Sequence, residues 1–258
     1  MKARIKFSKA GAMKFIGHLD VMRYFQKAFR RSEVKIEYSK GFSPHQLISF
    51  AAPLGVGLTS DSEYLDIVVT DSGSSKEMVD QINKVMTEGF HVLSFKKLDE
   101  DSKNAMSIVA AADYLVSLKD GYELVEDFQK KFTRFLNQDS ITILKKTKKS
   151  EVLMDIKPFI YYFSFDKADF NKQVNRKENT NASVADTYEN GITLYLRLAT
   201  GSVTNIKPEL VMEAFCQYIG IAFNKYAWGY HRLEVYANMG KDDEREFVPL
   251  DDVGTEVL

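Results

Sequence analysis

The chain has 258 residues, of which 45% are hydrophobic, and a formal net charge of −1 at pH 7. This length suits one large domain or two of ordinary size, and the small net charge excludes a uniformly basic protein. The single cysteine, Cys216, excludes an internal disulfide and a multi-cysteine metal cluster. Because we find no signal peptide and no run of 18 apolar residues, we expect a cytoplasmic protein without a membrane partner.

The first hundred residues contain six predicted elements. The alternation and helical periodicity predict strands at residues 2–8, 34–39, 64–69 and 91–98, and helices at residues 17–31 and 75–87. This order, βαββαβ, is typical of the ferredoxin-like fold with an antiparallel sheet.

The second half repeats a similar order after a linker at residues 99–112, whose polar, charged start at residues 99–104 marks the boundary. It contains predicted strands at residues 113–118, 141–145, 152–165, 192–198 and 226–236, and helices at 122–137 and 208–219. Residues 166–190 are polar and lack periodicity, which predicts a long mobile loop. We therefore expect an α+β protein with two ferredoxin-like halves, residues 1–98 and residues 113–258.

Charge is distributed unevenly along the chain. Residues 1–50 contain eleven Lys/Arg and three Asp/Glu, whereas residues 241–258 contain seven acids and two bases. This asymmetry suggests an anionic ligand near the amino-terminal end and an acidic tail at the other. The alternative is that the two stretches are merely solvated surfaces of opposite charge and bind no ligand.

The helix predicted at residues 17–31 is amphipathic. At 100° per residue its apolar side chains, Leu19, Val21, Met22, Phe25 and Phe29, share one side. Its cations, Arg23, Lys27, Arg30 and Arg31, share the other. A loop with Lys40, Phe42 and His45 follows, so we predict a nucleic-acid-binding surface.

Each of these residues has a simpler interpretation. The cations alone can form a solvated basic face, Phe42 can fill a core, and His45 can be a turn residue held by local hydrogen bonds. In the functional interpretation the cations contact phosphates, Phe42 stacks on a base, and His45 contacts a phosphate or a base.

The sequence gives little sign of catalysis. None of the four histidines has HxxxH or HExxH spacing, GVGLTS lacks the ending of a phosphate loop, and no CxxxCxxC motif occurs. We expect no metal and no cofactor. If the protein were a nuclease, His18 and His45 would be the acid–base candidates, because the imidazole pKa lies near neutrality. The simpler interpretation of His18 is a first-turn residue that packs or caps its helix.

Two segments carry a family resemblance. RIKFSKAGAMKFIGHLD (residues 4–20) and YSKGFSPHQLISFAAPLGVGLTSDSEYLDI (residues 38–67) resemble a bacterial radical SAM-linked family, the domain of unknown function 2344. The resemblance continues through residues 154–160 and 200–211. Its members occur as extensions of radical SAM proteins or as free-standing chains. The resemblance implies an accessory role in RNA modification, with a separately encoded radical SAM protein as partner.

Three functions follow as hypotheses. The first is a non-catalytic module that binds RNA or docks the radical SAM enzyme. The second is a metal-independent endoribonuclease, on a looser resemblance in fold to the CRISPR repeat-RNA endoribonucleases. The third is a protein-interaction scaffold whose acidic tail binds the partner.

Overall fold

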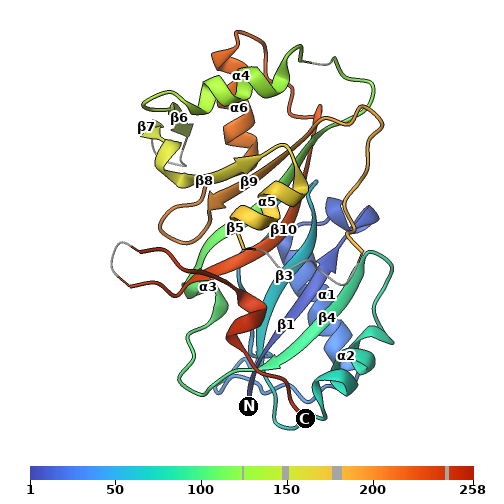
Figure 1. The fold of residues 1–258 in the computed structure, drawn as a ribbon. Helices are drawn as coiled ribbons and strands as arrows, with labels where there is room; N and C mark the ends of the chain where they lie inside the picture. The colour runs from blue at the N-terminus through green and yellow to red at the C-terminus, as the bar shows by residue number, and fades with distance from the viewer. Residues whose placement is uncertain (124, 147–150, 176–181, 242–243) are drawn as a thin grey trace. The chain divides into compact units, whose positions relative to one another are not determined.

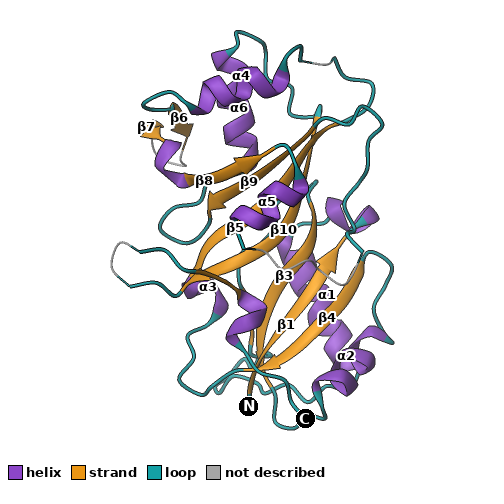
Figure 2. Ribbon diagram, in the orientation of Figure 1, coloured by secondary structure: helices purple, strands orange, loops and turns teal. Residues whose placement is uncertain are grey.

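The computed structural model describes the whole chain except residues 124, 147–150, 176–181 and 242–243 (Figure 1). Helices and strands are mixed along the chain, which confirms the predicted α+β class (Figure 2). The chain forms two compact units. Unit 1 comprises residues 1–111, 183–185 and 232–258, and unit 2 comprises residues 112–182 and 186–231. The predicted domains at residues 1–98 and 113–258 stay a prediction; residues 232–258 belong to unit 1.

Unit 1 contains an antiparallel sheet with the strand order β4-β1-β3. Its elements are β1 (Lys2–Lys9), the 3₁₀-helix η1 (Gly11–Phe15), α1 (His18–Arg31), β2 (Ile48–Phe50), β3 (Thr59–Val68), α2 (Ser75–Asn83), β4 (Phe90–Lys97), α3 (Ala105–Ile108), β11 (Phe247–Pro249) and the 3₁₀-helix η3 (Leu250–Val253). The short strand β2 pairs with β3, and β11 pairs with β10 (Trp228–Asn238). The predicted helix at residues 17–31 is confirmed as α1.

Both long helices of unit 1 cover one face of this sheet. Along β1 the alternate residues Ala3, Ile5 and Phe7 are buried in one core with side chains from α1 and α2. Phe25 of α1 is at the centre, where its ring lies 4.5 Å from that of Phe7 and 5.6 Å from that of Phe90. Because this core fixes the apolar side of α1, the cationic side of the helix faces away from the sheet.

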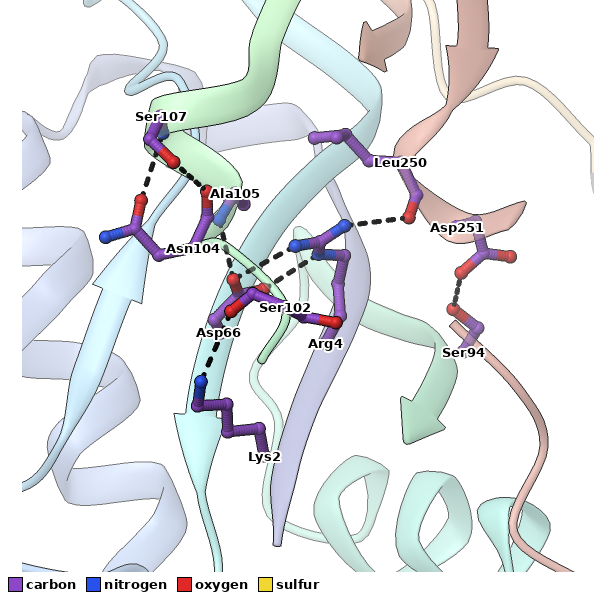
Figure 3. A network of polar contacts seen from close by, with 10 residues as sticks. All are labelled: Lys2, Arg4, Asp66, Ser94, Ser102, Asn104, Ala105, Ser107, Leu250 and Asp251. Atoms are coloured by element: carbon purple, nitrogen blue, oxygen red, sulfur yellow. Dashed lines mark hydrogen bonds and ion pairs between the residues drawn. The ribbon is translucent and has the colours of Figure 1, made fainter. Parts of the chain in front are cut away.

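The opposite face of the same sheet carries a polar network (Figure 3). Arg4 Nε donates to Asp66 Oδ1 at 2.8 Å, and Arg4 Nη1 donates to the Leu250 carbonyl at 3.2 Å. The backbone N–H of Ala105 donates to Asp66 Oδ2 at 2.7 Å. Leu250 is fully buried, so η3 packs within unit 1. This part of the acidic carboxyl-terminal stretch is therefore not an exposed tail.

Unit 2 has its own aromatic core. Its elements are most of β5 (Val109–Leu118), α4 (Phe128–Leu136), β6 (Thr142–Lys146), β7 (Glu151–Asp155), the 3₁₀-helix η2 (Lys157–Phe159), β8 (Ile160–Ser164), α5 (Lys167–Gln173), β9 (Thr193–Ala199), α6 (Pro208–Tyr218) and the first four residues of β10. Residues 232–238 of β10 belong to unit 1. β8 pairs with β9, and β6 pairs with β7 in a separate two-stranded sheet. Phe215 of α6 lies 5.1 Å from Phe132 and 5.5 Å from Phe128 of α4, which holds the two helices together.

Several predicted boundaries are wrong. Residues 34–39 make isolated bridges, Ile36 to Val69 and Tyr38 to Gln46, instead of a strand. The helix predicted at 122–137 begins only at Phe128, because Asp127 has a left-handed backbone with φ 51°. The helix predicted at 75–87 ends at Asn83, and the strand predicted at 152–165 is interrupted by η2, which contains a proline.

The loop predicted at residues 166–190 is also partly wrong, because residues 167–173 form α5. Asp166 caps this helix by accepting a 2.7 Å hydrogen bond from the Asp169 N–H. Phe170 anchors it, fully buried, with its ring 5.6 Å from Tyr195. The predicted mobility of residues 176–181 lies outside the described residues.

Candidate nucleic-acid interface

The four cations of α1 lie together on its exposed side. Arg23, Lys27, Arg30 and Arg31 are all exposed, whereas Val21, Phe25, Ala28 and Phe29 are buried. Residues three or four positions apart are neighbours on a helix surface, so Lys27 adjoins each of the three arginines. The predicted division of α1 into an apolar and a cationic face is therefore confirmed, apart from Leu19, which is exposed instead of buried.

Few intramolecular contacts engage these cations. Arg23 forms an exposed ion pair with Asp20 at 3.4 Å, and such pairs contribute little to stability. Arg30 Nε donates to the Gln26 carbonyl at 3.2 Å, and Arg31 Nη2 donates to the Val85 carbonyl at the same distance. Lys27 makes no hydrogen bond or ion pair within the described part of the chain. Folding thus leaves most of this positive charge facing solvent.

The loop after α1 is held by local hydrogen bonds. The Ser39 N–H donates to the His45 carbonyl at 2.8 Å, and the His45 N–H donates to Ser39 Oγ at 3.1 Å. Ser39 Oγ also lies 2.9 Å from His45 Nδ1. These contacts match the simpler interpretation of His45 as a locally bonded turn residue, and they leave its Nε2 side exposed. Lys40 in the same loop is exposed too.

Phe42 lies in the middle of this loop and has a relative accessibility of 112%. The simpler interpretation of Phe42, that it fills a core, is therefore wrong. Gly41 before it has φ 122°, a conformation that L side chains rarely adopt.

His18 is half-buried in the first turn of α1. Its ring meets that of Phe50 edge-on, with 5.1 Å between the centroids, so it packs as the simpler interpretation expects. Burial lowers the pKa of His18; the nearby Glu63 carboxylate opposes this shift and the Lys9 ammonium adds to it. The shift favours the uncharged form of the imidazole.

Three charged residues beside His18 escaped the sequence analysis. Lys9 is buried and donates from Nζ to the Ile16 carbonyl at 3.2 Å, and burial lowers its pKa. Glu63 pairs with Arg232, whose Nε donates to Glu63 Oε1 at 2.9 Å. Both side chains are more than nine-tenths buried. A charged residue inside a predicted strand is the signal that could have identified Arg232, because burying a charge is costly without a partner. Glu63 follows the polar run Ser60–Ser62 and carries no such signal.

The two remaining histidines are His91 and His231. His91 is exposed on β4, and His231 is buried on β10. Among the residues that the structure describes, no group of three or more His, Cys, Asp or Glu could hold a metal ion. No helix in that part of the chain is long and apolar enough to cross a membrane.

A family model described as "Uncharacterized protein conserved in bacteria (DUF2344)" matches residues 2–208. This range includes α1, the loop at residues 39–45, His18 and Glu63, whereas Arg232 lies beyond it. No curated protein matches the chain.

Proposed function

The chain belongs to this family of uncharacterized bacterial proteins, DUF2344, and from that premise we propose that it is a cytoplasmic, non-catalytic RNA-binding module. It serves a separately encoded radical SAM enzyme in RNA modification. In this proposal Arg23, Lys27, Arg30, Arg31 and Lys40 contact phosphates, and Phe42 and His45 lie beside the bound strand.

The exposed cationic side of α1 is the observation that carries the proposal. The helix presents four neighbouring cations that neither the core nor strong ion pairs engage. Sequence-independent RNA binding depends on such cations, because each neutralised phosphate releases a counterion. Lys40 and His45 extend the polar surface along the chain, since both are exposed.

The prediction that the chain contains ferredoxin-like halves is part of the same proposal. Unit 1 has the element order β1-α1-β2-β3-α2-β4, the strand order β4-β1-β3 with the short β2 paired to β3, and both long helices on one face. This arrangement supports the proposal, because a ferredoxin-like half has the order βαββαβ. We extend the proposal of a ferredoxin-like half to the second part of the chain on its sequence pattern.

A charge-reversal experiment tests RNA binding. The Arg23→Glu/Arg30→Glu variant should bind RNA at least roughly 10-fold more weakly than the wild type, for all sequences alike, because it places negative charge opposite phosphates. Lys130→Glu/Arg134→Glu on α4 is the matched control. It makes the same change in net charge, and Lys130 forms an exposed ion pair with Asp127 at 3.3 Å as Arg23 does with Asp20.

The results separate the proposal from its alternatives. Equal weakening by both variants would reduce the effect to net charge and contradict the proposed surface. A chain that captures a radical SAM protein but binds no RNA would be the protein-interaction scaffold instead.

The second candidate function is the metal-independent endoribonuclease. One observation favours it: the imidazole of His18, whose pKa burial lowers, lies in the field of Lys9 and Glu63 in the first turn of the cationic helix. A neutral histidine can act as a general base. Cleavage of RNA by the pure chain, lost in His18→Ala or His45→Ala, would support this function. RNA binding without cleavage would support the module.

A further inference from the structure

Two exposed apolar surfaces flank the cationic helix in the sequence. The first is Phe42, presented by the loop at residues 39–45 after α1. The hydrogen bonds between Ser39 and His45 close this loop, and the Tyr38–Gln46 bridge anchors its base. Burying a phenylalanine side chain stabilises a fold, but unit 1 leaves this ring fully exposed to solvent.

The second surface lies before and at the start of α1. Phe15, Leu19 and Val56 have relative accessibilities of 66%, 61% and 60%. The Gly57 N–H donates to the Lys14 carbonyl at 2.7 Å, which places Val56 beside Phe15. Lys14 Nζ lies 5.4 Å from the centroid of the Phe15 ring. A cation therefore accompanies this aromatic ring, as Lys40 accompanies Phe42 in sequence.

The segment between these surfaces is cationic. The fourteen-residue helix α1 is about 21 Å long and carries Arg23, Lys27 and Arg30 on its exposed side. Aromatic rings interleaved with cations are the pattern by which proteins bind single-stranded nucleic acid: cations follow the backbone and bases stack on the rings. An RNA duplex offers no comparable use for the rings, because its bases are stacked on each other and proteins contact its phosphates and 2′-hydroxyls.

We propose that this surface takes single-stranded RNA, whose unpaired bases stack on Phe42 and Phe15 while its phosphates lie along α1. This inference rests on the proposed RNA-binding function and names the form of RNA that the site takes. The stacking is tolerant of sequence, because every base has an aromatic face.

The test compares an unstructured RNA single strand with a fully paired duplex of equal length, in the same buffer. Phe42→Ala and Phe15→Ala should each weaken binding of the single strand about 10-fold and leave duplex binding unchanged. Phe42→Trp should retain the affinity. Tyr226→Ala is the matched control, because Tyr226 is an exposed ring in unit 2 with Lys225 Nζ 4.9 Å from its centroid.

A fluorescence titration reports the stacking directly. The wild type contains one tryptophan, Trp228, which is buried and supplies the background signal. In Phe42→Trp the added fluorescence should be quenched by the single strand and not by the duplex.

Three results would overturn the inference. The first is an equal loss of affinity for the single strand and the duplex, and the second is no loss of affinity in either alanine variant. The third is a tryptophan at position 42 whose fluorescence the single strand does not quench. If RNA still binds with salt dependence in those cases, the proposed function stands and only the single-strand inference fails. If neither RNA binds the wild type, the proposed function fails as well.

Discussion

The ammonium of Lys6 lies 2.8 Å from Oε2 of Glu234, although the two residues are 228 positions apart in the chain. Both side chains are more than nine-tenths buried. Tyr64 donates its hydroxyl to Glu234 Oε1 at 2.7 Å, and Ser62 Oγ donates to Oε2 at 3.3 Å. Glu234 thus joins the carboxyl-terminal stretch of unit 1 to β1 and β3 through satisfied hydrogen bonds.

Removing Lys6 should destabilise the protein strongly. In Lys6→Met the Glu234 carboxylate stays buried without its cation, which costs about 3–5 kcal/mol of the free energy of unfolding. Urea denaturation measures this loss. Lys76→Met is the control, since Lys76 pairs with Asp80 on an exposed helix surface, and it should leave the free energy of unfolding nearly unchanged. Equal effects of the two substitutions would contradict the role of burial.

Asp251→Asn should change the pH dependence of stability. Burial raises the pKa of Asp251, although Ser94, Lys6 and Lys96 oppose the shift. Between the unfolded-state pKa of about 3.9 and the higher folded-state pKa, the folded protein therefore binds more protons than the unfolded chain. The free energy of unfolding falls as the pH rises through this range. The variant lacks this penalty, so it should be more stable than the wild type at pH 7 and similar near pH 3.5.

Asp71→Asn gives a control of opposite sign. The hydrogen bond and charge of Lys35 hold the pKa of exposed Asp71 below its usual value, so this variant should lose stability at pH 7. A less stable Asp251→Asn protein at pH 7 would mean that the two lysines outweigh burial.

His18 should titrate below the ordinary histidine pKa of about 6.5 in the folded protein. Its neutral form contributes stability above that pH, and this contribution is lost as the pH falls through the folded pKa. An NMR titration of the imidazole measures it. Lys9→Met should raise the pKa of His18 and Glu63→Gln should lower it further, because the two charges act in opposite directions. Shifts of the same sign would contradict this assignment.

A pair of phenylalanine substitutions separates core from surface. Phe25→Leu should destabilise the protein by about 1–2 kcal/mol, because Phe25 is fully buried among aromatic rings. Phe42→Leu should change the free energy of unfolding by less than about 0.5 kcal/mol. Denaturant unfolding of both variants is the measurement, and a destabilised Phe42→Leu protein would place Phe42 in a core.

Sequence alone predicts what depends on local periodicity. The helical repeat separates Phe25 from Arg23 and Lys27 correctly, because a helix fixes which side each residue faces. It fails for Leu19, which is in the first turn and remains exposed with Phe15. The pattern can place a residue on a side of a helix, but it does not show where the packed sheet ends.

Tertiary partners explain the other failures. Glu63 and Arg232 meet across 169 positions, and no local pattern links them. The composition of residues 241–258 suggested a free acidic tail, yet Leu250 is fully buried and Asp251 accepts a hydrogen bond from Ser94. The polar composition of residues 166–190 likewise gave no indication of α5, because the buried ring of Phe170 is what anchors this helix.

The salt dependence of RNA binding tests the central claim most directly. For a single strand, the logarithm of the binding constant should fall against the logarithm of salt concentration with a slope of roughly −0.7 for each phosphate neutralised. The account predicts a flatter slope for Arg23→Glu/Arg30→Glu and an unchanged slope for Lys130→Glu/Arg134→Glu. Equal slopes and equal affinities for the wild type and Arg23→Glu/Arg30→Glu would contradict it.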